Sequence, residues 1–70
     1  MKEIFINSEY IKLTQFLKFA GISGSGAEAG ILVKEGKVSI NDELCFEKGK
    51  KLTGGEIISL NGEEYKVSRL

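Results

Sequence analysis

The sequence predicts an α+β domain in which two short helices pack on a small, mostly antiparallel β-sheet. Three observations predict this class: an alternating apolar segment at the start, two stripes of helical period after it, and a second half that alternates again between glycine-rich turns. Short helices followed by a run of strands are typical of α+β folds. Seventy residues suffice for one domain, so we expect a single unit over residues 1–70.

The first strand and the first helix are predicted by a change of period near residue 13. Residues 2–7, KEIFIN, mix β-branched and aromatic side chains in alternation, which favours a strand. From Leu13 the apolar residues recur at i, i+3, i+4 and i+7, which predicts an amphipathic helix over 13–20. Gly21 follows, and glycine adopts the left-handed conformation that ends many helices without steric cost.

A second helix is expected to begin near Ser25 and to end at Gly36. Ser25 and Glu28 have the spacing of a capping box. Gly30 lies inside this helix, where glycine costs about 1 kcal/mol relative to alanine. We therefore expect Gly30 to permit the close approach of another element or of a ligand backbone. The apolar stripe of this helix consists of Ala29, Leu32 and Val33.

The second half of the chain predicts strands joined by turns. Val38 and Ile40 alternate with polar residues, the segment NDE turns the chain, and LCF at 44–46 is predicted to be a short strand. EKGKK is expected to be a charged loop, and a Gly-Gly turn leads into the strand of LTGGEIISL. Asn61-Gly62 predicts a type I′ hairpin turn before the last strand, EEYKV.

Composition narrows the function classes. Ten basic and ten acidic residues give a net charge of zero, so any nucleic-acid hypothesis must depend on where the lysines lie. A hydrophobic share of 41% with 29% charged residues is typical of a folded soluble domain. Neither a signal peptide nor an apolar run of membrane length is apparent, so we expect a cytoplasmic protein without a membrane partner.

Catalytic and metal-binding patterns are missing from the sequence. The chain has no histidine and one cysteine, which excludes the common zinc spacings and the histidine-activated nucleophiles. The carboxylates are scattered, and GSGAEAG matches neither the Walker nor the dinucleotide pattern. We therefore expect that the chain is not an enzyme and that it binds neither a metal nor a cofactor. Cys45 is interpreted as a small buried apolar residue, with a reactive thiol as the alternative.

A helix N-terminus that begins with small residues can bind phosphate, because its free N–H groups remain accessible. Gly24, Ser25 and Gly26 meet this description, although a plain tight turn explains them as well. The lysines between residues 12 and 51 could form one basic face if the sheet packs on the helix pair, and a scattered solvated surface is the alternative. These residues are Lys12, Lys18, Lys34, Lys37, Lys48, Lys50 and Lys51.

An ordered series of short motifs resembles the RNA-binding domain family first named after ribosomal protein S-four. The series covers about residues 11–60 and includes KGKKL, which is similar to the basic segment of short stand-alone bacterial members. Its parts are Leu13-x-x-x-Leu17, AGI at 20–22, Ser25, Ala29, Leu32-Val33, GKVSIN at 36–41, KGKKL at 48–52 and GGEI at 54–57.

The resemblance implies a non-catalytic domain that presents its helix pair and an adjoining loop to structured RNA, and we expect a monomer. Ribosomal or transfer RNA would be the partner, in ribosome assembly or translation. On this interpretation the turn at 24–27 faces phosphates and lysines supply positive charge. With Lys12 and Lys18 added from the distribution of lysines, the candidate RNA-binding residues are Lys12, Lys18, Gly24, Ser25, Gly26, Lys37, Lys48, Lys50 and Lys51.

Three departures from the family pattern affect affinity more than fold. Gly26 stands where members often carry arginine, Glu56 replaces an aspartate, and Asn41-Asp42 replaces Asn-Gly. The missing arginine removes a bidentate phosphate donor, so we expect weak recognition of RNA shape and phosphates.

The alternative to RNA binding is a protein-interaction module that keeps the fold. Its marker would be an exposed apolar patch, with Phe19 or Phe46 as candidates. The aromatic residues are otherwise predicted to be core or half-buried positions rather than stacking platforms. They are Phe5, Tyr10, Phe16, Phe19, Phe46 and Tyr65.

Overall fold

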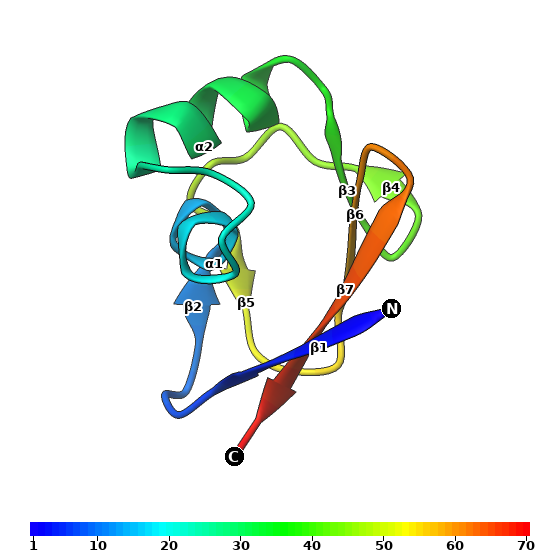
Figure 1. Cartoon of the computed structure of the whole chain (residues 1–70). Helices are drawn as coiled ribbons and strands as arrows, with labels where there is room; N and C mark the ends of the chain where they lie inside the picture. The colour runs from blue at the N-terminus through cyan, green and yellow to red at the C-terminus, as the bar shows by residue number, and fades with distance from the viewer.

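The computed structural model describes residues 1–70, which form two helices and seven strands (Figure 1). The helix pair follows two short strands and precedes the remaining five, as an α+β class requires. In chain order the elements are β1 (Lys2–Ile6), β2 (Ile11–Lys12), α1 (Leu13–Phe19), α2 (Gly26–Lys34), β3 (Val38–Ile40), β4 (Glu43–Leu44), β5 (Lys51–Leu52), β6 (Ile57–Leu60) and β7 (Glu63–Arg69).

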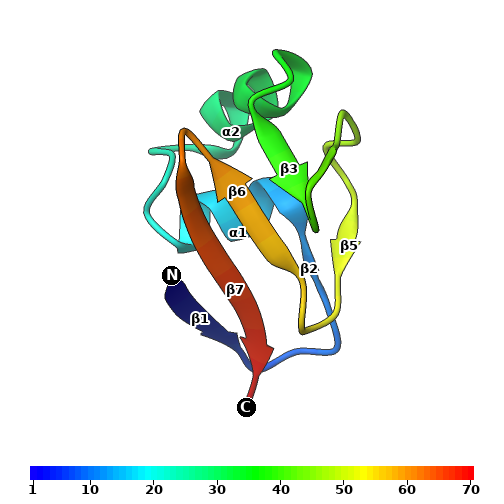
Figure 2. The ribbon, with the colours of Figure 1, turned by 90° about the vertical axis from the view of Figure 1, so that its right-hand side faces the viewer.

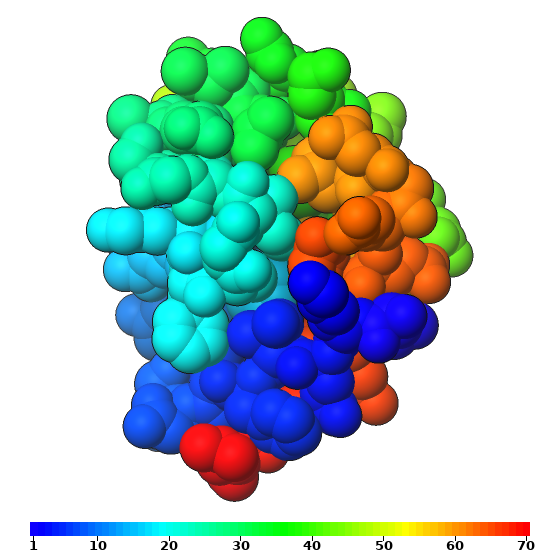
Figure 3. All heavy atoms as spheres, viewed as in Figure 1, coloured from blue at the N-terminus to red at the C-terminus, as the bar shows by residue number.

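The strands form a five-stranded sheet of order β1-β7-β6-β3-β4 and a separate pair, β2-β5. All pairings are antiparallel except that of β1 with β7, so the predicted mostly antiparallel sheet is confirmed. The parallel pair joins the first strand to the last, and Figure 3 shows the N-terminal residues against the C-terminal ones. Ser68 Oγ donates a 2.6 Å hydrogen bond to Glu3 Oε2 across this pair.

The core lies between the five-stranded sheet and a layer made of the helices and the β2-β5 pair (Figures 1 and 2). Leu13, Phe16 and Leu17 of the first predicted stripe are fully buried. From α2, Ala29 and Val33 reach the same core. The other buried apolar residues are Ile6, Val38, Leu52, Ile58, Leu60, Tyr65 and Val67.

Both helices begin and end close to the predicted residues. Ser25 Oγ accepts a 3.1 Å hydrogen bond from Glu28 N, which caps the first turn of α2. Gly21 and Gly36 follow the two helices with φ of +78° and +72°, as expected of glycine beyond a helix C-terminus. Neither helix has the length and apolarity needed to cross a bilayer.

The predicted hairpin turn at residues 61–62 is confirmed by the positive φ of Asn61 and Gly62, 51° and 81°. Next to it, Tyr65 is nearly buried, and its hydroxyl donates to Glu63 Oε2 at 2.8 Å. This hydrogen bond, helped by burial and by the charge of Glu63, raises the pKa of Tyr65 above its ordinary 10.0.

The predicted strand at 44–46 is confirmed only in part, because β4 covers Glu43–Leu44. Cys45 N still donates to Val38 O of β3 at 3.0 Å, and the chain then leaves the sheet toward α1, where Lys50 O accepts from Leu13 N at 2.8 Å. Cys45 therefore lies at the margin of the core and is half-buried rather than buried. The β2-β5 pair is not predicted by any periodicity, because each strand has two residues.

Candidate nucleic-acid interface

Four lysines gather where β2, β5 and the preceding loop meet the start of α1. Strands β2 and β5 pair so that Lys12 lies directly opposite Lys51. The loop is attached to the first turn of α1, because Leu13 N donates to Lys50 O at 2.8 Å and Thr14 N to Lys48 O at 3.3 Å. These bonds satisfy N–H groups that a helix start leaves free. We call the four exposed residues Lys12, Lys48, Lys50 and Lys51 the lysine edge.

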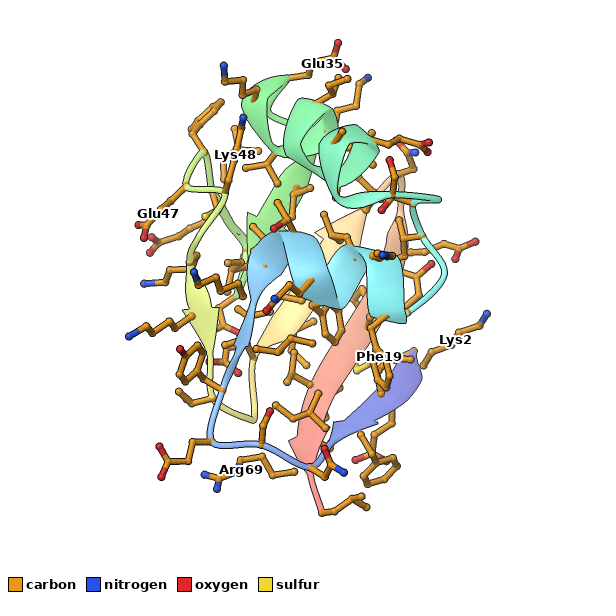
Figure 4. The ribbon with its side chains drawn as sticks, turned by 90° about the vertical axis from the view of Figure 1, so that its left-hand side faces the viewer. Lys2, Phe19, Glu35, Glu47, Lys48 and Arg69 are labelled. Atoms are coloured by element: carbon orange, nitrogen blue, oxygen red, sulfur yellow. The ribbon has the colours of Figure 1, made fainter.

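The side chain of Lys48 extends from the loop onto α2 (Figure 4). A Cβ atom at Gly30 would lie 3.4 Å from Cδ and Cε of Lys48 and 3.5 Å from its Nζ. The expectation that Gly30 permits a close approach is therefore confirmed, and the approaching group is an ammonium-bearing side chain. One charged side chain of the lysine edge thus lies against the second helix.

Within the lysine edge, positive charges face one another. Like charges directly opposite on paired strands destabilise the pair, so Lys12 and Lys51 favour an anion between or beside them. Lys51 Nζ lies 4.7 Å from the centroid of the Tyr10 ring, a cation–π distance. The ammonium groups are exposed and are available to phosphate oxygens.

Acidic residues are only partly kept away from the lysine edge. Glu43 and Glu47 line the same depression as Lys50, although Figure 4 shows Glu47 pointing away from Lys48. Other carboxylates are engaged within the five-stranded sheet and its turns, where Glu3 accepts from Ser68 and Glu63 from Tyr65. The positive charges of Lys12, Lys48 and Lys51 are therefore less screened by carboxylates than the charge of Lys50.

Glu56 closes the turn before β6. Its carboxylate accepts hydrogen bonds from the backbone N–H of Thr53 at 2.9 Å and of Gly54 at 2.8 Å. Partial burial alone raises the pKa of the Glu56 carboxyl, but these backbone hydrogen bonds outweigh it and hold the pKa below its ordinary 4.5. Glutamate therefore performs a turn-closing role at the position where the family pattern has aspartate.

The remaining site residues expected from the sequence lie elsewhere. Gly24, Ser25 and Gly26 form the start of α2, where a Cβ at Gly24 would lie 3.7 Å from Glu28 Oε2. A carboxylate is thus already close to this helix N-terminus. Lys37 follows the opposite end of α2, after Gly36. Lys18 lies on the outer side of α1 in a groove with Gln15 and Phe19.

The exposure of the aromatic residues corrects the sequence interpretation. Phe16 and Tyr65 are buried, but four other aromatic residues are exposed, so the expectation of core or half-buried positions is wrong for these four. They are Phe5 at 48%, Tyr10 at 41%, Phe19 at 62% and Phe46 at 61% exposure. The signal was present for Phe19, because residue 19 falls outside the stripe of residues 13, 16, 17 and 20.

The chain is similar in sequence to several proteins of bacteria. It is 39% identical over 59 residues to RlbA of Bacillus subtilis strain 168, named as a probable ribosome maturation protein, with 84% of this chain and 83% of RlbA covered. It is 33% identical over 58 residues to YbcJ of Escherichia coli K12, named as a candidate RNA-binding protein, with 83% of each covered. Ribosomal large subunit pseudouridine synthase B of B. subtilis is 40% identical over 58 residues, which are 83% of this chain and 22% of that enzyme.

Solved structures of two proteins also resemble this chain. The solution structure of E. coli YbcJ, described as having an αL motif involved in RNA binding, superposes with a TM-score of 0.74 at 29% identity, over 97% of this chain and 87% of YbcJ. The 30S ribosomal protein S4e of Thermoplasma acidophilum shares the fold at 21% identity, with a TM-score of 0.71 over 86% of this chain and 32% of S4e. The family model of the S4 domain matches residues 4–68, and the chain therefore belongs to the S4-domain family.

Proposed function

We propose that this chain is a non-catalytic, monomeric RNA-binding domain that recognises structured ribosomal or transfer RNA through its phosphates. The observation that carries the proposal is the lysine edge, which backbone hydrogen bonds attach to the start of α1. The names of RlbA and YbcJ support RNA as the partner and ribosome assembly or translation as the setting. In pseudouridine synthase B the matched region is only 22% of the chain, so we assign catalysis to the remainder of such proteins.

The proposed mechanism is local electrostatic attraction. A net charge of zero produces little long-range steering, so binding depends on ammonium groups within a Debye length of the phosphates, about 8–10 Å at moderate salt. Four phosphate contacts correspond to a slope of log affinity against log salt of about −3 to −4. Selectivity then comes from how the backbone of a folded RNA fits the lysine edge and the two helices.

The test is a charge reversal with a matched control. Lys50→Glu/Lys51→Glu changes the lysine edge, whereas Lys2→Glu/Lys66→Glu makes the same change in net charge on exposed positions of β1 and β7. Affinity for a stem-loop RNA is measured by fluorescence anisotropy across a salt series. We expect about a tenfold or greater loss and a shallower salt slope only for the first variant.

Circular dichroism of both variants checks that the fold is kept. Equal losses for the two double variants would mean that binding follows total charge and that the lysine edge is not the site. If the wild-type protein does not bind RNA even at low salt, the proposed function is wrong.

A protein-interaction module is the second candidate. It is favoured by an apolar depression formed by exposed Phe5, Phe19 and Leu70 together with Ile6 and Ile11. Exposed apolar patches with a polar rim are characteristic of interaction sites. This candidate predicts that charge reversals at the lysine edge leave partner binding unchanged, whereas Phe19→Asp abolishes it.

A further inference from the structure

We propose that a groove on the outer side of α1 receives unpaired nucleobases of the bound RNA, an inference that rests on the proposed function. The groove runs between two exposed aromatic rings, Tyr10 and Phe19. Six residues line it: Ser8, Tyr10, Ile11, Gln15, Lys18 and Phe19. The ligand class is therefore a folded RNA with single-stranded nucleotides next to the segment that the lysine edge holds.

The two rings supply stacking surfaces. Phe19 is the last residue of α1 and is 62% exposed, and Figure 4 shows it projecting from the end of the helix. Tyr10 is 41% exposed immediately before β2. Every base has a π-face, so aromatic rings bind unpaired bases with little sequence preference.

Polar side chains in the groove with the two rings can bind the base edge and the phosphate of a stacked nucleotide. Gln15 Oε1 accepts a 3.3 Å hydrogen bond from Lys12 N, which orients the side chain and leaves the amide N–H groups for a base edge. Lys18, exposed in the same groove, can contact the phosphate of a stacked nucleotide. The six lining residues include one cation and no carboxylate, so the groove attracts an anionic ligand.

The groove is continuous with the lysine edge. Lys51 Nζ lies 4.7 Å from the Tyr10 ring centroid, so this ring contacts the lysine edge as well as the groove. Lys12 provides a second connection through its backbone bond to Gln15. An RNA strand whose phosphates contact Lys12 and Lys51 can therefore pass directly into the groove, where its unpaired bases meet Tyr10 and then Phe19.

The test compares two stem-loop RNAs that differ only in their loop bases. One has a loop of uridines, and the other has abasic ribose-phosphate units of equal number and charge. We expect the wild-type protein to prefer the uridine loop by about fivefold to a hundredfold, the range of one stacked base. Phe19→Leu should bring this preference close to one and leave affinity for the abasic loop unchanged. Tyr10→Leu should also lower the preference, and any effect on the abasic loop reports the contact of this ring with Lys51.

Two further variants make the test specific. Phe19→Tyr retains an aromatic ring and should restore the preference, whereas Lys50→Glu should weaken both RNAs by the same factor. In a Tyr65→Phe background, Tyr10 is the remaining tyrosine of a chain without tryptophan, so its fluorescence reports the groove directly. We expect quenching by the uridine loop and little by the abasic loop.

The outcomes separate this inference from the function on which it rests. If both RNAs bind equally in a lysine-dependent way and the Phe19 and Tyr10 variants behave as wild type, the nucleobase site is wrong, RNA binding stands, and the rings belong to a protein surface. If neither RNA binds, the proposed function fails and the groove assignment fails with it.

Discussion

Gly30 shows how one missing side chain positions a charge. The residue is buried in α2, and the aliphatic part of Lys48 lies over it. Helix propensity opposes glycine at this position, so the tertiary contact rather than local preference explains what the residue does. The same site offers two substitutions with opposite consequences.

Gly30→Ala is expected to stabilise the domain by about 0.5–1 kcal/mol through helix propensity. Its Cβ would meet the flexible end of Lys48 at 3.4 Å, an ordinary contact that a small shift accommodates. Thermal unfolding should show a Tm higher by about 2–8 °C with RNA affinity unchanged. Gly30→Leu should instead displace Lys48 and lower affinity, and a Gly30→Ala protein that binds RNA poorly would contradict this account.

Glu56 predicts a pH dependence of stability. Because hydrogen bonds lower the pKa of its carboxyl in the folded state, the unfolded state binds the proton more readily. The stabilisation is present above the unfolded value, near 4.5, and is lost as pH falls through the lowered folded value. Glu56→Gln should cost about 1 kcal/mol at neutral pH, a modest figure because the carboxyl is partly exposed.

Urea unfolding of both proteins at several pH values measures that cost. The difference between wild type and Glu56→Gln should shrink steadily below pH 4.5. A difference that stays constant down to acid pH would assign the effect to packing instead of to the ionised carboxylate.

At the scale of elements, the helices and turns were predictable, and the β2-β5 pair was not. The stripe from Leu13, the cap at Ser25 and the hairpin at Asn61 are local signals, and the structure confirms each of them. Strands of two residues have no period to detect, and their pairing joins residues about forty positions apart in the chain. Because this pairing brings Lys12 opposite Lys51, the sequence could suggest a basic face but could not show which lysines form it.

The predicted site was also larger than the cluster that the fold brings together. Lys37 follows the C-terminal end of α2, and Lys18 lies on the outer side of α1, in the groove that adjoins the lysine edge rather than within the edge. The sequence alone could not show how these lysines divide between different surfaces. The exposure of Phe46 had no local signal either, because the end of β4 is decided by its pairing with β3.

The start of α2 provides a test at the same scale. Ser25→Ala removes the hydroxyl that accepts from Glu28 N and should destabilise the domain by about 1 kcal/mol. If the turn at 24–26 is only a cap, RNA affinity stays unchanged under conditions where the variant is folded. A loss of affinity beyond the loss of stability would place Ser25 among the phosphate contacts. Denaturant unfolding and anisotropy titration on the same preparation distinguish the two results.

For the whole molecule, a net charge of zero is compatible with a basic edge because some carboxylates accept hydrogen bonds within the five-stranded sheet. Glu3 and Glu63 accept hydrogen bonds on the five-stranded sheet, whereas Glu56 accepts from Thr53 and Gly54 in the turn between β5 and β6. The lysine edge lies on the other layer, with β2, β5 and the helices. The bonds that build the sheet thus hold the charges of Glu3 and Glu63 on the layer opposite the lysine edge.

The parallel pairing of β1 with β7 also sets the order of events during synthesis. The ribosome makes β1 first and β7 last, yet the two are neighbours in the finished sheet. Until β7 has been made and is free to pair, Ile4 and Ile6 lack their strand partner and the core lacks Tyr65 and Val67. The five-stranded sheet is therefore complete only once β7 is available to pair, and until then the first strand remains exposed to chaperones or to other nascent chains.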